Sequence, residues 1–232
     1  MKLSVLMPVH NEVRTVANIV ERVLAVPLEQ EIVLVNDGSS DGTSGVVDGL
    51  TSSRVKAIRH PTNQGKGAAL RAGFRRALDD GYGAVLTLDA DGQHDPAEIP
   101  RFLRAYAERQ SDLIIGARDF RQIPPLRRVA NTLGRWSFSW ALGQPVRDNQ
   151  SGYRLISRRT MEAALPSREN GFEFEVEMIV TCVEQDFVLD WVSIRTIYAG
   201  EKSHINPWQH VVNFLRLVWQ TRQRTRQMGR EA

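Results

Sequence analysis

The stretch Val85–Pro96, VLTLDADGQHDP, decides the fold because an apolar run ends there in two carboxylates, Asp89 and Asp91. A short apolar run followed by Gly and Pro is typical of a buried strand that leads into a turn. The two carboxylates are separated by one residue, and their like charges repel unless a positive charge lies nearby. Two interpretations stay open: the pair holds a cation, or it consists of solvated turn residues and helix caps.

The chain has 232 residues, a net charge of +3 and 42% hydrophobic residues, as expected for one large α/β domain or two small ones. Its single cysteine, Cys182, lies among apolar residues, so we expect a buried side chain, no intramolecular disulfide and a reducing compartment. No stretch reaches the ~20 apolar residues that a spanning helix needs, and the N-terminus lacks a signal-peptide cleavage site. We therefore expect a cytoplasmic protein or one attached to a membrane surface.

Short apolar runs alternate with helical patterns over the first 120 residues, which predicts βαβ units and a mainly parallel sheet. The predicted strands are Leu3–Val9, Glu31–Val35, Val55–Ile58, Ala84–Leu88 and Asp112–Gly116. The predicted helices of this half are Val13–Val26 and Gly67–Leu78.

The second half is richer in helical patterns. We predict helices at 124–142 and after Ser157, which suits an N-cap. The stretch at 171–185 alternates as a strand would, but its length and later spacing favour a helix. A loop that enters a strand is predicted within 148–157, and a further strand over 187–198. Pro207 opens a last helix with apolar residues at helical spacing and several arginines.

Polar clusters follow four of the predicted strands: HNE at 10–12, NDGSSDG at 36–42, DADGQ at 89–93 and ARD at 117–119. The carboxyl ends of parallel strands meet at one edge of a sheet, and ligands bind there. We therefore expect all four clusters along one rim.

The DADGQ cluster suits a hard cation. The carboxylates of Asp89 and Asp91 can reach one ion, and Gln93 can add a neutral oxygen. Oxygen ligands fit Mg²⁺ or Mn²⁺, with phosphate oxygens completing the coordination. His94 follows, and a lone histidine beside acids is typical of a solvated residue or one that supports a ligand.

Two other motifs suit a nucleotide. Asp37, in a Gly/Ser-rich turn, can accept hydrogen bonds from a base or ribose, although a plain turn explains it equally well. Lys66 lies between Gly65 and Gly67 at a predicted helix start, where backbone amides and the ammonium suit a diphosphate. The spacing is not that of a P-loop, and a solvated lysine at a helix start is the alternative.

Taken in order, the motifs PVHNE, NDGSSDGT, NQGKGAA, DADGQHDP, GAR and DNQSGYR resemble those of family 2 glycosyltransferases, and most of all the polyprenyl-phosphate sugar transferases of the dolichyl-phosphate mannose synthase group. The resemblance covers roughly residues 3–205. It implies an α/β fold of the GT-A, Rossmann-like type, with a mixed, mainly parallel sheet flanked by helices and a C-terminal amphipathic helix. It also implies one domain over residues 1–206, with a nucleotide-sugar half at 1–120 and an acceptor half at 121–206, followed by the helix at 207–232.

The resemblance implies a metal-dependent, inverting transfer of a hexose from a nucleotide sugar, of the GDP-mannose or UDP-glucose type, to a polyprenyl phosphate. The metal, Mg²⁺ or Mn²⁺, would be bound by Asp89, Asp91 and Gln93, with Asp91 also catalytic. The residues implied for donor binding are Pro8, His10, Asn11, Glu12, Asp37, Lys66, Asp89, Ala90 and Asp91.

A lipid phosphate is already anionic, so it needs cations that position it rather than a strong general base. The acceptor-binding candidates are Arg118, Arg127, Asn131, Arg154, Lys202 and His204. Asp148 is the candidate base if the acceptor presents a hydroxyl instead.

The chain departs from the family pattern in three places. Asn36 precedes Asp37 where two aspartates are common, Asn131 follows Arg127 where the family has serine, and TIYAGEKSHINP at 196–207 lacks an upstream arginine. The processive Gln-x-x-Arg-Trp signature is absent, which argues against polymer synthesis.

The segment 207–232 has aromatic and aliphatic residues on one side and five arginines, as an interfacial helix would. We expect it to hold the protein on the inner face of the cell membrane, a surface that Trp136 and Trp140 would share. The alternatives are packing on the core and contact with a second copy in a homodimer. No motif that reads nucleic acid accompanies the arginines.

Two other functions stay open: a soluble transferase that acts on a small metabolite or glycan hydroxyl, and a non-catalytic nucleotide-binding scaffold at a membrane surface.

Overall fold

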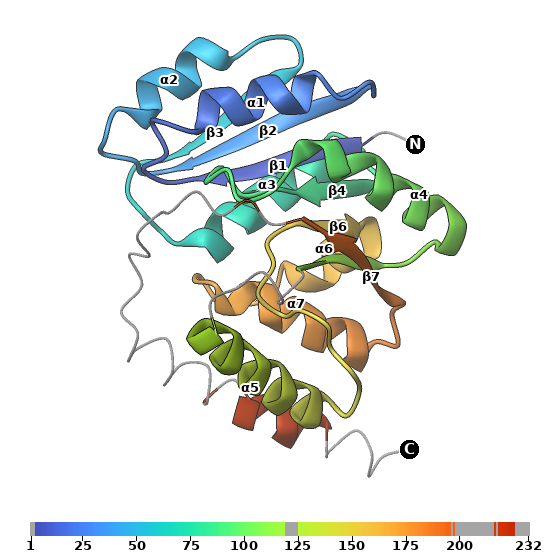
Figure 1. Cartoon of the computed structure of the whole chain (residues 1–232). Helices are drawn as coiled ribbons and strands as arrows, with labels where there is room; N and C mark the ends of the chain where they lie inside the picture. Colours follow the sequence, from blue (N-terminus) through green and yellow to red (C-terminus); the bar gives the residue numbers. More distant parts are fainter. Residues whose placement is uncertain (1–2, 119–124, 196, 198–215, 217, 226–232) are drawn as a thin grey trace.

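The computed structural model describes residues 3–118, 125–195, 197, 216 and 218–225. Over these residues, seven strands form one sheet in the order β3-β2-β1-β4-β6-β5-β7 (Figure 1). The strands are β1 Leu3–Val9, β2 Gln30–Asp37, β3 Val55–His60, β4 Ala84–Thr87, β5 Leu113–Arg118, β6 Arg154–Ser157 and β7 Leu189–Ile194. The five strands predicted in the first half are all present.

The sheet is parallel except at β6, which runs antiparallel to both of its neighbours, β4 and β5. The predicted mixed, mainly parallel sheet is therefore confirmed. Because β6 is reversed, its first residue, Arg154, pairs with Thr87 at the end of β4. The loop before β6 thus lies beside the DADGQ cluster, a neighbourhood that no local pattern predicts.

Helices cover both faces of the sheet (Figure 1). They are α1 Val16–Leu24, α2 Thr43–Leu50, α3 Lys66–Asp79, α4 Ile99–Arg109, α5 Pro125–Leu142, α6 Arg158–Ala164 and α7 Glu173–Glu184, and a 3-10 turn, Pro96–Glu98, precedes α4. Helices α1, α2 and α4 pack on one face; α3, α6 and α7 pack on the other, and α5 lies outside α7.

Local chemistry sets several of these boundaries. Helix α1 begins three residues later than predicted because Glu12 O accepts from the amides of Thr15 and Val16, which makes a turn first. Ser157 caps α6 as predicted, since its side chain accepts from the amide of Thr160. No bounds were predicted for helices α2 and α4.

Each face of the sheet has its own apolar core. Phe74, Phe174 and Met161 belong to the core under α3, α6 and α7, whereas Val20 and Phe102 belong to the core under α1 and α4. Cys182 is buried as predicted, and burial raises the pKa of its thiol to about 12.

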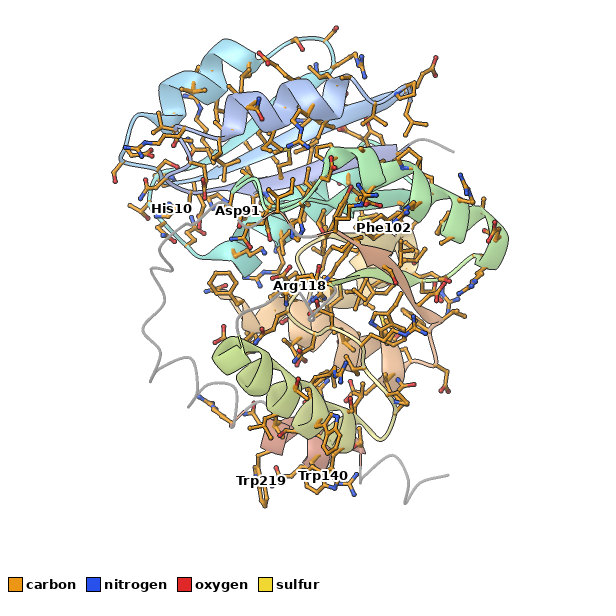
Figure 2. The ribbon with its side chains drawn as sticks, viewed as in Figure 1. His10, Asp91, Phe102, Arg118, Trp140 and Trp219 are labelled. Carbon is orange, nitrogen blue, oxygen red and sulfur yellow. The ribbon has the colours of Figure 1, made fainter. Side chains whose placement is uncertain are left out.

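Residues 218–225 are helical and pack against α5 and α7. Val218 is buried in the core, and Arg224 bridges Glu177 at 2.6 Å and Glu184 at 2.5 Å, both in α7. The described part of the predicted C-terminal helix therefore packs on the core through one side, while Trp219 points outward (Figure 2). Among the residues described, no helix is long and apolar enough to cross a membrane.

Candidate functional site

A cavity of about 440 Å³ lies at the carboxyl ends of β1, β2 and β4, the rim that the sequence predicts. Its volume is within the range of small-molecule sites. It is lined by Pro8, Val9, His10, Glu12, Asp37, Asn63, Gly65, Lys66, Ala69, Asp89, Ala90, Asp91, Gly171 and Phe172. Every predicted donor residue except Asn11 is among these, and His10 and Asp91 share this edge in Figure 2.

His10 is held in one orientation by its neighbours. Its Nδ1 lies 2.8 Å from the carbonyl oxygen of Asp37, which can only accept, so Nδ1 carries the proton. Nε2 then accepts from the side-chain amides of Asn63 at 3.0 Å and Asn11 at 3.2 Å. Asn11 thus supports the cavity from behind His10, and its left-handed backbone (φ 58°) lets its Oδ1 accept from Ser40 N.

The buried carboxylate of Asp37 organises the loop that leads into α3. It accepts from His60 Nδ1 at 2.7 Å and from the amides of Gln64 at 2.9 Å and Gly65 at 2.8 Å. These bonds leave little of the carboxylate for a ligand. If Asp37 binds the base or ribose as predicted, one of its carboxylate oxygens must therefore accept a hydrogen bond from the ligand in addition to those from the loop.

Two amides at the start of α3, those of Gly67 and Ala68, are already occupied and are not offered to a diphosphate. The carbonyl of Asn170, in the connection between α6 and α7, accepts from Gly67 N at 2.7 Å and Ala68 N at 3.4 Å. The helix is thus capped by a distant backbone group, and Lys66 is the charged residue of this motif that lines the cavity.

Lys66 forms two ion pairs at the floor of the cavity. Its Nζ lies 2.7 Å from Asp89 Oδ1 and 3.0 Å from Glu175 Oε2 of α7. Burial disfavours the charged ammonium, but the two carboxylates outweigh this effect and raise the pKa of Lys66 above its usual value. Burial alone would also raise the pKa of Asp89, yet Lys66 and His94 lower it, so Asp89 stays ionised.

Asp91 is the carboxylate that fits a divalent cation best. Its pKa is raised by burial and by the negative charge of Asp89, so a cation here would relieve both effects. Its Oδ1 accepts from Gln93 N at 2.9 Å, which fixes the loop. The described residues hold no cluster of three or more His, Cys, Asp or Glu side chains suited to a metal, so a metal would also need oxygens from a diphosphate.

His94, whose role the sequence left open, is buried beside Asp89. Its Nε2 lies 3.5 Å from Asp89 Oδ2, and its ring packs 5.2 Å from the ring of Tyr153. His94 therefore supports the carboxylate from below the cavity.

Gly152 is part of the site although sequence reasoning did not single it out. A Cβ at this position would overlap Asp89 Oδ2 and would lie 2.7 Å from Lys66 Nζ. The carbonyl of Gly152 accepts from Thr87 Oγ1 at 2.7 Å, which fastens the loop to the end of β4. The SGYR loop can thus lie directly beside the ion pair because Gly152 has no side chain.

The acceptor candidates that are described lie in two different settings. Arg118, half-buried at the end of β5, grips Asp148 with two bonds, Nε–Oδ2 at 2.7 Å and Nη2–Oδ1 at 3.0 Å. Asp148 is only 1% exposed, and its Oδ1 also accepts from Gln150 N. A carboxylate held in this way is a poor general base.

Arg154 is fully buried, so the structure contradicts its predicted contact with an acceptor. Its guanidinium donates to the carbonyls of Ser151, Asn149 and Glu175, and it fastens the loop before β6 to α7. The side chains of Arg127 and Asn131, and the residues Lys202 and His204, lie outside the described part of the structure.

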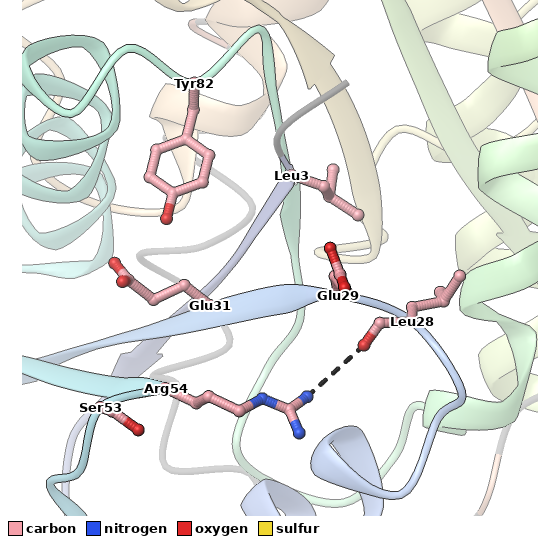
Figure 3. Close-up of a pocket in the computed structure, with 7 residues that line it drawn as sticks. All are labelled: Leu3, Leu28, Glu29, Glu31, Ser53, Arg54 and Tyr82. Atoms are coloured by element: carbon pink, nitrogen blue, oxygen red, sulfur yellow. Dashed lines mark hydrogen bonds between the residues drawn. The ribbon is translucent and has the colours of Figure 1, made fainter.

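A second hollow of about 440 Å³ lies at the amino ends of β1 and β2 (Figure 3). Burial and the charge of Glu31 raise the pKa of its Tyr82 to about 12, so the phenol stays protonated. Ligands of parallel sheets bind at the opposite edge, and we therefore do not assign this hollow to the donor.

Comparison with known proteins gives one family. A profile described as "Glycosyl transferase family 2" matches residues 4–166. The chain is 32% identical over 192 residues to an undecaprenyl-phosphate mannosyltransferase of Micrococcus luteus, an alignment that covers 77% of this chain and 76% of that protein. It is 33% identical over 199 residues to a polyprenol monophosphomannose synthase of Mycolicibacterium smegmatis, with 79% and 72% covered.

Crystal structures of glucosyl-3-phosphoglycerate synthase from Mycobacterium tuberculosis share the fold. The complex with uridine diphosphate has a TM-score of 0.68 at 18% identity, covering 95% of this chain and 78% of that chain. The complex with Mn²⁺, UDP-glucose and phosphoglyceric acid has a TM-score of 0.67 at 17% identity, with the same coverage. At this identity the likeness establishes the fold alone, and it confirms the predicted fold class.

Proposed function

The chain belongs to glycosyl transferase family 2 and is a glycosyltransferase, and from this premise we propose that it moves a hexose from a nucleoside diphosphate to a polyprenyl phosphate. The observation that carries the proposal is the cavity in which Lys66, Asp89 and Asp91 meet at the carboxyl ends of β1 and β4. This arrangement places one partly buried ammonium, and a carboxylate, that of Asp91, whose pKa is raised, where a diphosphate and its metal would bind. The relatives named above support the lipid acceptor.

In this proposal the donor lies along the cavity. The base and ribose face His10 and Asp37, and the diphosphate faces Lys66 and Asp91. When bound by Asp91 and diphosphate oxygens, Mg²⁺ or Mn²⁺ supplies neutralisation of the charge that develops on the leaving nucleoside diphosphate. Lys66 neutralises Asp89, so that the negative charge beside the diphosphate is reduced. The half at residues 1–120 would thus hold most of the donor, with Gly171 and Phe172 lining the same cavity, and the half at 121–206 would hold the acceptor.

The acceptor is proposed to be a phosphate because Asp148, the candidate base for a hydroxyl acceptor, is held by Arg118. Both oxygens of Asp148 are engaged by Arg118, so it is poorly placed to take a proton from a hydroxyl. A phosphate oxygen is already ionised and attacks the anomeric carbon directly, displacing the nucleoside diphosphate with inversion. We propose that Arg118, with Arg127, Asn131, Lys202 and His204, positions that phosphate.

We also propose that the protein works on the inner face of the cell membrane. Trp136, Trp140 and Trp219 are exposed, and Trp140 and Trp219 lie at the same end of the molecule (Figure 2). Arg222 stacks 4.7 Å from the Trp140 ring, so aromatic and basic groups mix there as in interfacial surfaces. Cosedimentation with anionic but not neutral vesicles supports this location, whereas concentration-dependent dimerisation without vesicle binding favours a contact between copies.

The function is tested by transfer from a panel of labelled nucleotide sugars, including GDP-mannose and UDP-glucose, to polyprenyl phosphate with Mn²⁺. We expect label in the organic extract for at least one donor and its loss in Asp91→Asn with the melting temperature retained. A folded protein that transfers from none of the donors contradicts the proposal and favours the scaffold.

A further inference from the structure

The connection between α6 and α7, residues 165–172, is fastened to the start of α3. Arg71 donates to Glu169 O and to Asn170 Oδ1, and Asn170 O accepts from Gly67 N at 2.7 Å. A Cβ at Gly65 would overlap Asn170 O, so the two segments pack as closely as backbone allows. The end of the connection is therefore fixed relative to Lys66.

This connection ends in Phe172, an aromatic residue that lines the cavity and is 50% exposed. Phe174, two residues later, shows the contrast: it is fully buried, with its ring 6.0 Å from that of Phe74. Phe174 packs in the core, whereas half of the Phe172 side chain is exposed. An aromatic ring at the edge of a cavity that also holds charged side chains fits a ligand-binding surface.

The ring lies toward the diphosphate side of the cavity. Its centroid is 5.5 Å from Lys66 Nζ, which in turn is 2.7 Å from Asp89 Oδ1. His10 and Asp37, which face the base and ribose in our proposal, belong to other loops, after β1 and at the end of β2. A group attached beyond the diphosphate would therefore meet Phe172 before it met any part of the base-binding side.

Hexoses carry such an apolar patch. The C–H bonds on one face of a pyranose ring are apolar and slightly positive, and the face of an aromatic ring is slightly negative. The bonds at Glu169 and Asn170 hold the backbone that leads to Phe172, so little backbone freedom is lost when a sugar packs on its ring. The hydroxyl groups on the rim of the sugar stay free for the polar side of the cavity.

We propose that Phe172 is the platform on which the transferred sugar of the donor packs, and that it determines specificity for the sugar and not for the base. This inference rests on the proposed function, and it adds a residue that the sequence motifs did not indicate.

The test compares each nucleotide sugar with the same nucleotide lacking its sugar. Isothermal titration calorimetry with Mn²⁺ gives affinities for UDP-glucose and UDP, and for GDP-mannose and GDP, in the wild type and in Phe172→Ala. For the base that the wild type binds, we expect Phe172→Ala to reduce the affinity for the nucleotide sugar roughly three- to tenfold. The affinity for the nucleoside diphosphate without its sugar should change less than about twofold. Phe172→Tyr restores the affinity, because it restores the ring.

The matched control is Val188→Ala. Val188 is equally exposed, at 51%, and lies just before β7 at the opposite edge of the sheet, so neither affinity is expected to change. Equal weakening of sugar nucleotide and diphosphate in Phe172→Ala, or no weakening of either, overturns the platform role while the proposed function stands. A wild type that binds neither kind of nucleotide contradicts the proposed function itself.

Discussion

A methyl group at position 152 is the smallest change that we expect to disable the site. In Gly152→Ala the new Cβ overlaps Asp89 Oδ2 and lies 2.7 Å from Lys66 Nζ, so the buried ion pair must move. Gly152 is not among the residues with positive φ, so the obstacle is the ion pair and not the backbone. Overpacking of this kind costs about 1–3 kcal/mol of the free energy of unfolding.

For a chain of this length, 1 kcal/mol shifts the melting temperature by roughly 2–4 °C, so Gly152→Ala should melt roughly 2–12 °C below the wild type. Moving Asp89 by about 1 Å relative to the donor should reduce kcat/KM roughly 10²-fold. The assays are thermal melting and sugar transfer at subsaturating nucleotide sugar.

Gly45→Ala is the matched control, because it makes the same chemical change in α2 where no atom lies within 4 Å of the new Cβ. Alanine is favoured over glycine inside helices by about 0.5–1 kcal/mol, so this variant should melt at or above the wild-type temperature with unchanged transfer. Wild-type stability and wild-type transfer in Gly152→Ala would refute the packing of Gly152 against the ion pair.

Three further results are expected. Lys66→Met leaves Asp89 and Glu175 buried without their cation, which should lower the free energy of unfolding, measured in urea, by about 3–5 kcal/mol. Adding Glu175→Gln should restore part of that stability. No recovery in the double variant contradicts the ion pair between Lys66 and Glu175. Burial raises the pKa of Cys182 to about 12, so at pH 8 its thiol should react with a thiol reagent at least ~10²-fold more slowly in the native protein than in urea. Rapid reaction of the native protein with the reagent would contradict the burial of Cys182. Arg224→Ala should lower the free energy of unfolding by about 1 kcal/mol, because solvent screens a side chain that is 37% exposed. An unchanged midpoint of urea unfolding would mean that the ion pairs of Arg224 with α7 contribute nothing to stability.

The strands of the first half could be predicted because β1, β2, β4 and β5 are short apolar runs that are buried in the sheet and followed by turn residues, whereas β3 is a half-exposed edge strand that begins with the buried Val55. The family and fold were also predicted correctly, from motifs that follow those strands. The bounds of helix α2 were not predicted because it has eight residues and two of them are glycines, Gly45 and Gly49, which weakens any helical pattern. The reversed strand β6 was predicted as a strand, but its position between β4 and β5 depends on pairing between distant segments.

The site was predicted in part for the same reason. Residues that follow strands of a parallel sheet share one edge, so the cluster of His10, Asp37 and Asp89 follows from the fold class. Glu175 and Phe172 were missed because they reach the cavity from α7 and the connection before it, where no strand end marks them. Arg154 was misassigned because an arginine beside SGYR suggests a phosphate contact, whereas the fold buries it under three carbonyls.

The central claim, transfer to a lipid phosphate, is tested most directly by offering the protein polyprenyl phosphate, the corresponding polyprenol, or phosphoglyceric acid with one labelled nucleotide sugar and Mn²⁺. The initial rate of label entering the organic phase separates lipid products from water-soluble ones. We predict label in the organic phase with polyprenyl phosphate and none with polyprenol, because Asp148 is engaged by Arg118 and cannot serve the hydroxyl as a base. Equal rates with polyprenol, or label that stays in water with phosphoglyceric acid as the better acceptor, would contradict it.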